Sequence, residues 1–168
     1  MAQQSKQSQT QERATYLTLI GIFLGIFAAF SKREDDKRRP INFSGLDVAM
    51  LGLATFRAGR LAAYDRVTEP LRAPVTDTKP DEYGAGENVV AQAEGSGFRK
   101  AAGELVSCPT CVGTWAGAAM VYGLRIAPQP TRLFIAFMSA TGLAELIDNA
   151  SEAMSWTGKA QRKASAPE

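Results

Sequence analysis

Two cysteines, Cys108 and Cys111, are the residues whose type and spacing best suit chemistry. They form a Cys-Pro-Thr-Cys sequence immediately before an apolar stretch that is expected to be helical. A cysteine at a helix N-terminus has its thiolate stabilised by the helix dipole and by backbone amides. Thiol–disulfide oxidoreductases use this arrangement, usually where a strand leads into a helix of a soluble α/β domain, and no such domain is expected here.

Metal binding and a structural role are the other interpretations of this pair. Two thiolates cannot complete a tetrahedral zinc site, so zinc or iron is expected only if Cys108 and Cys111 are shared between chains. A structural pair at the membrane boundary would stay reduced in the cytoplasm. The chain contains no histidine and so lacks the commonest general base and nitrogen ligand. We therefore assign no catalytic residue, expect no other cofactor, and lean away from an enzyme.

Charged residues gather around the segment that follows Tyr64. Asp65 and Glu69 alternate with basic residues near a turn-forming Thr-Glu-Pro sequence, and either could pair with Arg57, Arg60 or Arg72. One interpretation is a site for a lipid headgroup or a protein partner. We favour the other, an intramolecular ion-pair network.

Two further acids, Glu145 and Asp148, are three residues apart and share one face of an expected helix. An acid inside a membrane helix is a candidate functional group by default. These two lie near one end of their helix and could reach Arg57 and Arg60. We therefore favour structural ion pairs over a proton relay.

Small residues recur at helix-packing spacing in two apolar stretches. Gly21 and Gly25 form one GxxxG pattern, and Gly113 and Gly117 form another. In membrane helices this spacing allows close backbone approach, either within one chain or between copies. A homo-oligomer or a larger membrane complex is therefore a possible assembly.

The apolar stretches predict an all-α integral membrane protein. Residues 15–31 predict an uncleaved transmembrane helix, because they run directly into a charged segment without a cleavage site. Residues 110–148 predict a transmembrane helical hairpin that turns at Pro128-Gln129-Pro130. The polar ends, 1–14 and 158–168, are expected to be disordered tails.

Residues 44–64 are less apolar, because three charged residues fall among them: Asp47, Arg57 and Arg60. An amphipathic helix in the membrane interface, or packed on the other helices, suits this pattern. Residues 73–100 are rich in proline, glycine and acids, which predicts a flexible loop with one helical turn near Val89–Ala93.

Positive charges give an expected orientation. They cluster between residues 31 and 40 and at the base of the hairpin, at Arg99, Lys100, Lys159, Arg162 and Lys163. By the positive-inside rule both segments face the cytoplasm, which requires that residues 44–64 do not cross. We therefore predict three spans in the plasma membrane, with the N-terminus outside and the C-terminus cytoplasmic. The net charge of +2 is too small to indicate nucleic acid, so the lipid bilayer is the expected partner.

Two strings together resemble a known family. These are FRAGRLAAYDRVTEPLR, from Phe56 to Arg72, and ELVSCPTCVGTWAG, from Glu104 to Gly117. They resemble a bacterial family of small membrane proteins of unknown function that includes a sporulation-associated member. The matching residues are Arg57, Arg60, Leu61, Asp65, Thr68, Glu69, Pro70, Arg72, Cys108, Pro109, Cys111, Gly113 and Trp115. The resemblance spans roughly Asp47 to Ile147, and it implies a bacterial membrane location and no established activity.

Overall fold

The computed structural model describes residues 2–35, 42–80 and 89–164 of the chain. Most of them are helical, as the sequence predicts. The elements in order are α1 (Ala2–Asp35), α2 (Gly45–Ala63), a 3₁₀ turn (Arg66–Thr68), α3 (Glu69–Arg72), β1 (Thr76–Pro80), β2 (Val89–Ala93), α4 (Phe98–Ser107), α5 (Pro109–Ile126) and α6 (Pro128–Ala164).

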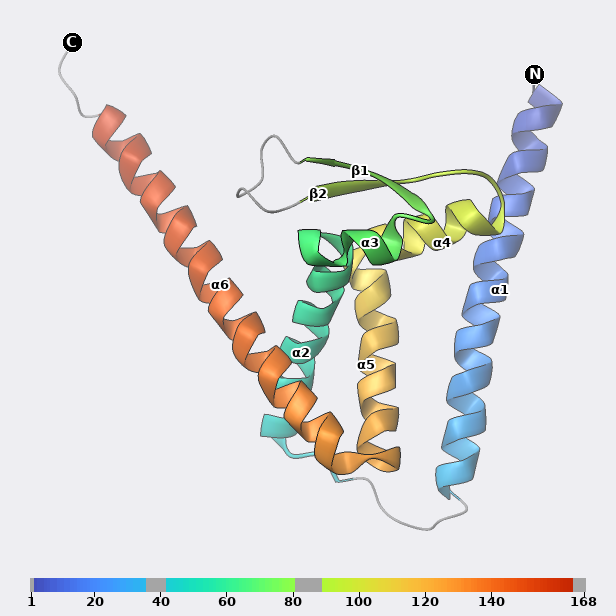
Figure 1. Cartoon of the computed structure of the whole chain (residues 1–168), viewed down its shortest axis with the longest axis horizontal. Coiled ribbons are helices and arrows are strands. Elements are labelled where there is room, and N and C mark those ends of the chain that lie inside the picture. Colours follow the sequence, from blue (N-terminus) through green and yellow to red (C-terminus); the bar gives the residue numbers. More distant parts are fainter. Residues whose placement is uncertain (1, 36–41, 81–88, 165–168) are drawn as a thin grey trace.

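Helix α2 lies between α5 and α6 at the centre of the molecule (Figure 1). The buried core consists of Ala54 from α2, Met120 from α5, and Ile135 and Met138 from α6. Glycines bring these helices close together. A Cβ atom on Gly59 would lie 2.3 Å from the carbonyl oxygen of Pro109, so only glycine fits at this crossing.

Local sequence fixes where the central helices begin. Ser44 caps α2 through a capping box, in which its side chain accepts from the backbone of Asp47 and the Asp47 carboxylate accepts from the backbone of Ser44. Cys108 caps α5, whose first residue is Pro109. Helix α5 ends at Ile126 and α6 begins at Pro128, so the chain turns at Ala127. The Pro-Gln-Pro sequence, which was predicted to be the turn, forms the first turn of α6.

A small β-hairpin occupies the segment expected to be a loop. Strands β1 and β2 pair antiparallel, with Thr76 opposite Ala93, and the turn of helix expected at Val89–Ala93 is wrong. β-Branched threonine and valine suit strands. Helix α4 follows and packs on the hairpin, where a Cβ atom on Gly103 would lie 2.5 Å from the carbonyl oxygen of Val75. Residues 81–88 lie outside the described residues.

The expected disordered tails are largely helical. Helix α1 already begins at Ala2, and α6 continues to Ala164, whereas Met1 and residues 165–168 lie outside the described part of the chain. Glutamine, alanine, lysine and arginine are good helix formers, and extending an existing helix costs less than nucleating a new one. The polar segments therefore prolong the apolar helices that they adjoin.

Two stretches are long and apolar enough to cross a membrane, Ala14–Arg33 and Pro128–Lys159. Helices α4 and α5 would together form a third, although they meet at a bend of 85°. Large apolar side chains project from both candidate spans, including Leu17 and Leu133, which are 68% and 74% exposed. This outer surface fits a protein that lies in a bilayer.

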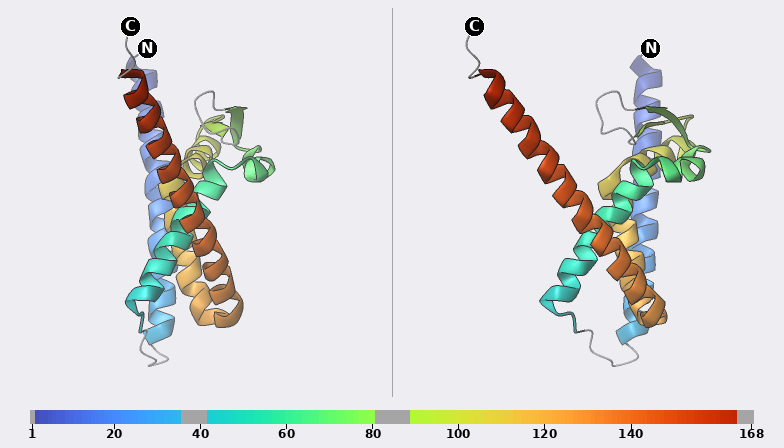
Figure 2. Two further views of the ribbon diagram at one scale, coloured as in Figure 1. Left: turned by 90° about the vertical axis from the view of Figure 1, so that its left-hand side faces the viewer. Right: turned by 60° about the vertical axis from the view of Figure 1, so that its left-hand side comes forward.

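The helix directions differ from the three-span prediction. Helices α1 and α5 run one way, whereas α2 and α6 run the other way, so the end of α1 lies beside the α5–α6 turn (Figure 2). The β-hairpin, the start of α1 and the end of α6 lie at the opposite end. Helix α2 thus lies along its neighbours rather than across their ends. Lys32 and Arg33 in the last turn of α1 therefore lie at the opposite end of the bundle from Arg99 and Lys100 at the start of α4.

Candidate functional site

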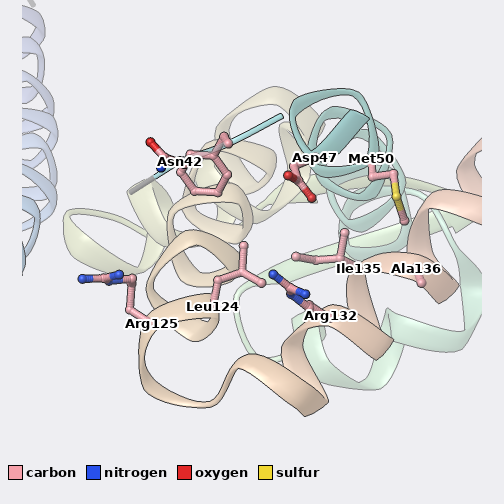
Figure 3. A pocket seen from close by; sticks show the side chains of 9 residues that line it. Asn42, Asp47, Met50, Leu124, Arg125, Arg132, Ile135 and Ala136 are labelled. Atoms are coloured by element: carbon pink, nitrogen blue, oxygen red, sulfur yellow. The ribbon is translucent and has the colours of Figure 1, made fainter. Parts of the chain in front are cut away.

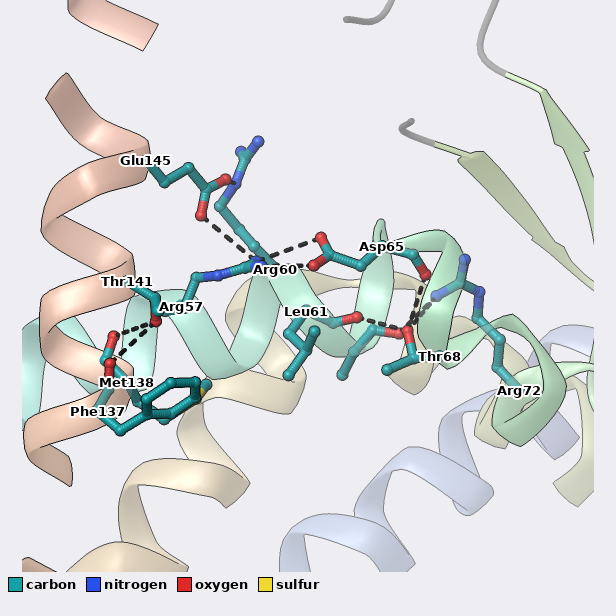
Figure 4. A network of polar contacts seen from close by, with 11 residues as sticks. Arg57, Arg60, Leu61, Asp65, Thr68, Arg72, Phe137, Met138, Thr141 and Glu145 are labelled. Atoms are coloured by element: carbon teal, nitrogen blue, oxygen red, sulfur yellow. Dashed lines mark hydrogen bonds and ion pairs between the residues drawn. The ribbon is translucent and has the colours of Figure 1, made fainter. Parts of the chain in front are cut away.

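Charged residues of α2 and α6 meet in one network (Figure 4). Arg57 donates two hydrogen bonds to the carboxylate of Asp65, at 3.2 and 2.6 Å. Arg60 donates through Nε to Glu145, whose second oxygen lies 3.5 Å from a guanidinium nitrogen of Arg57. The side chains are each about one-fifth to one-quarter exposed. The expected ion pairs of Arg57 and Arg60 with Glu145 are therefore present.

The segment after α2 is held by hydrogen bonds rather than by further ion pairs. The hydroxyl of Thr68 lies 2.5 Å from the carbonyl oxygen of Leu61 and 2.9 Å from that of Asp65. Arg72 donates to the carbonyl oxygen of Ala62 at 2.9 Å and to the Thr68 hydroxyl at 3.0 Å. These contacts fold the Thr-Glu-Pro elbow back onto the end of α2.

Three residues that were expected to form ion pairs lie outside this network. Arg72 is only 2% exposed, and its Nε and Nη2 atoms have no hydrogen-bond partner among the residues that the structure describes. Glu69 begins α3, and Asp148 is exposed on the wall of a groove of about 460 Å³ beside Glu145. Within the described residues neither acid forms an ion pair. Asp148 lies nearly a turn beyond Glu145, past the reach of the α2 arginines.

The two cysteines are free thiols and lie side by side at the start of α5. Their sulfur atoms are 2.6 Å apart, and Cys108 Sγ also accepts from the backbone amide of Cys111 at 3.3 Å. Hydrogen bonding by the Cys111 thiol is the main cause that lowers the pKa of Cys108 below its ordinary value. The Cys108 sulfur is thus the acceptor in both contacts, and Cys111 is the more exposed of the two thiols.

No third metal ligand joins the cysteines. In the described ranges no group of three or more Cys, Asp or Glu side chains could hold a metal ion. A zinc or iron ion shared between the cysteines of two chains stays a prediction.

A groove of about 460 Å³ opens beside the thiols. Helix α1 forms one wall, with Tyr16 and Phe23 among its lining residues, and the end of α4 with the first turns of α5 forms the other. Phe23 contacts Trp115 edge to face, with ring centroids 4.9 Å apart. Sequence reasoning missed the contribution of α1, because no local pattern says which helix will face the cysteines.

A second pocket, of about 430 Å³, lies at the opposite end of the bundle. Asp47 of α2 lies across it from Arg132 of α6, and Leu124 and Ile135 give it an apolar base (Figure 3). The Asp47 carboxylate is already occupied by the backbone amide and hydroxyl of Ser44, at 2.9 and 2.7 Å. This pocket therefore combines two arginines, Arg125 and Arg132, with apolar surface, close to where α5 turns into α6.

The two GxxxG patterns are in different surroundings. Gly113 and Gly117 of α5 face Thr55 of α2, whose side-chain oxygen would lie 3.0 Å from a Cβ atom on Gly117. Cβ atoms on Gly21 and Gly25 of α1 would meet no atom within 4 Å. The Gly113 and Gly117 pattern packs α5 against α2 within the chain, whereas no other part of the described chain packs against the Gly21 and Gly25 pattern.

The network and the dithiol lie within one family match. Residues 50–151 match the family described as a protein of unknown function (DUF1360), which spans from α2 through most of α6. This chain belongs to that family. It is also 31% identical over 106 residues to the sporulation protein YjcA of Bacillus subtilis (strain 168), which covers 62% of this chain and 90% of that protein. No solved structure matches it. The family resemblance predicted from the sequence is thus confirmed.

The family match leaves two segments of this chain outside it. These are residues 1–49, which include α1 with its open glycine face and the first turn of α2, and the last part of α6 after residue 151. The network, the elbow and both cysteines all lie inside the match, so they belong to the part that this chain shares with the family.

Proposed function

We propose that this protein is a small polytopic membrane protein that acts as a structural or interaction subunit rather than as a catalyst. The observation that carries the proposal is the pairing of charged side chains between α2, the segment after it and α6. Arg57 and Arg60 are neutralised by Asp65 and Glu145, and these contacts join α2 to α6. Charges that are paired with each other hold helices together, which supports a structural role for this network.

Helix α1 is the surface that we propose for a partner in the membrane. Its glycine pair is open, and its large apolar side chains Leu17, Ile20 and Leu24 are all more than half exposed. A second membrane helix gains van der Waals contact where small residues allow close approach. We propose another copy of this chain, or a larger membrane complex, as the partner. The name of the Bacillus subtilis relative adds a sporulation-linked process to this proposal.

A double variant, Gly21→Leu with Gly25→Leu, tests this proposal. In lipid nanodiscs or by cross-linking in native membranes, we expect the variant to lose its self-association or its complex, because leucine blocks close helix approach. Its thermal unfolding temperature should stay unchanged, since both positions face open space.

Gly52→Leu is the matched control, because Gly52 of α2 is equally open but lies on another helix. It should leave the assembly intact. A wild-type protein that stays alone at every concentration and in native membranes, or a double variant that assembles normally, would contradict the proposal.

A further inference from the structure

The dithiol is a chemically reactive pair that lies outside the ion-pair network. Both sulfur atoms line the groove between α1 and α5, and Cys111 is exposed there. The groove's volume of about 460 Å³ lies within the range of roughly 300 to 1,000 Å³ that is usual for small-molecule sites. A small ring compound that enters the groove would therefore meet the thiols directly.

The composition of the groove selects an apolar reagent. Its α1 wall belongs to a candidate membrane span, and its lining includes Leu19, Phe23 and Trp115 but no Lys or Arg. Glu104 is the single carboxylate in the lining. A charged, water-soluble oxidant would lose its hydration on entering such a groove, whereas an uncharged ring could pack against the aromatic side chains.

We propose that Cys108 and Cys111 form a redox-active dithiol that a lipid-soluble quinone oxidises in the groove between α1 and α5. The Cys108 thiolate adds to the quinone ring and forms a carbon–sulfur bond. The Cys111 thiolate then attacks the Cys108 sulfur, which forms the disulfide and returns the bonding electron pair to the ring. In total the dithiol loses two electrons and two protons, and the quinone gains them to become a hydroquinone.

This role goes beyond the proposed structural function and is tested separately from it. Purified protein in nanodiscs is mixed, without oxygen, with a short-chain benzoquinone, and quinone absorbance and free thiols are followed together. We expect one quinone to be reduced per chain, with the loss of both thiols and the formation of an intramolecular disulfide. Cys108→Ser should abolish the reaction, whereas Cys111→Ser should stop at the adduct of Cys108 with the ring and form no intramolecular disulfide. Both variants should keep the thermal unfolding temperature of the wild type.

A pair of α1 variants tests the groove itself. Phe23→Leu removes a ring from the groove lining, and we expect the quinone concentration for half-maximal rate to rise about fivefold. Phe27→Leu is the matched control, because Phe27 faces Tyr122 and does not line the groove, and it should leave that concentration unchanged.

Two outcomes would overturn the proposal. Oxidation by a water-soluble disulfide, such as oxidised dithiothreitol, but not by the quinone would show an aqueous thiol-exchange site instead. Thiols that resist both reagents, in protein that unfolds normally, would show a purely structural pair. Neither outcome depends on whether the Gly21 and Gly25 surface assembles.

Discussion

One carboxylate, that of Glu145, serves two arginines of the neighbouring helix. Arg60 binds one of its oxygens, and Arg57 lies near the other while also binding Asp65. The cluster contains two positive and two negative groups and is therefore neutral as a whole. A neutral cluster can lie in a partly buried position, whereas losing one member leaves an uncompensated charge.

Glu145→Gln should therefore destabilise the bundle. We expect a loss of about 2 kcal/mol in the free energy of unfolding, below the range for fully buried pairs because these side chains keep some solvent contact. Equilibrium unfolding in mixed micelles measures this loss.

Asp148→Asn is the matched control, since Asp148 is an exposed acid on the same helix without an ion pair in the described chain. It should change the unfolding free energy by less than about 0.5 kcal/mol. Equal losses in the two variants would mean that the network contributes nothing specific.

Among the secondary-structure elements, the contacts between helices decide which glycines can be replaced without a steric collision. Gly59 and Gly52 lie on the same helix, two turns apart. A Cβ atom on Gly59 would collide with the backbone of Pro109, whereas one on Gly52 would meet open space. A backbone carbonyl cannot rotate away as a long side chain can, so the collision has to separate α2 from α5.

Gly59→Ala should accordingly cost about 2 kcal/mol or more of unfolding free energy. Gly52→Ala should be neutral or stabilise by up to roughly 1 kcal/mol, because alanine favours the helix. Thermal unfolding of the two variants in the same detergent checks this difference. A tolerated Gly59→Ala would place α2 farther from α5 than the structure does.

The sequence predicted the long helices and missed the hairpin for physical reasons. Uncharged apolar runs identify α1 and the later helices without knowledge of their neighbours. Strands β1 and β2 are five residues each and are supported by contacts from elsewhere, such as the hydrogen bond from Glu94 to Val75 and the packing of Gly103. Local composition carries no trace of these contacts.

The candidate site, like the fold, was predicted only in part from the sequence. Arg57, Arg60 and Glu145 could be matched because opposite charges were spaced along apolar helices. The burial of Arg72 depends on the elbow, which the Thr68 hydrogen bonds shape, and spacing alone does not reveal it. Asp148 shares a face with Glu145 in the sequence but lies beyond the arginines in space.

The path of the whole chain shows why the charge rule chose three spans. Basic residues lie at both ends of this bundle. When α2 is left out of the membrane, the three-span prediction places the two basic clusters on the cytoplasmic side, as the positive-inside rule requires. The arginines of α2 argued against its insertion, and in the structure they pair with Asp65 and Glu145. Helix α2 is not among the described stretches that are long and apolar enough to cross a membrane, and the number of spans stays a prediction. The cytoplasmic location of the C-terminus stays a prediction, but the structure places the start of α1 at the same end.

Labelling of single cysteines tests this path. In a Cys108→Ser, Cys111→Ser background, cysteines at Phe43 and Gln129 should react with an impermeant reagent from one side of the membrane. A cysteine at Ser155 should react only from the other side, because α6 runs between these ends (Figure 2). The three-span arrangement would instead place Phe43 and Ser155 on the same side.

Helix α6 has a mechanical consequence. It is continuous from Pro128 to Ala164, roughly 55 Å at about 1.5 Å per residue, and residues 146–157 are all exposed. Its first part is clamped by the core and by Glu145, while the rest extends away from the bundle (Figure 1). Because only the first part of α6 is held, a sideways force on its free part near Trp156 acts as a torque on the pairing of Glu145 with the two arginines.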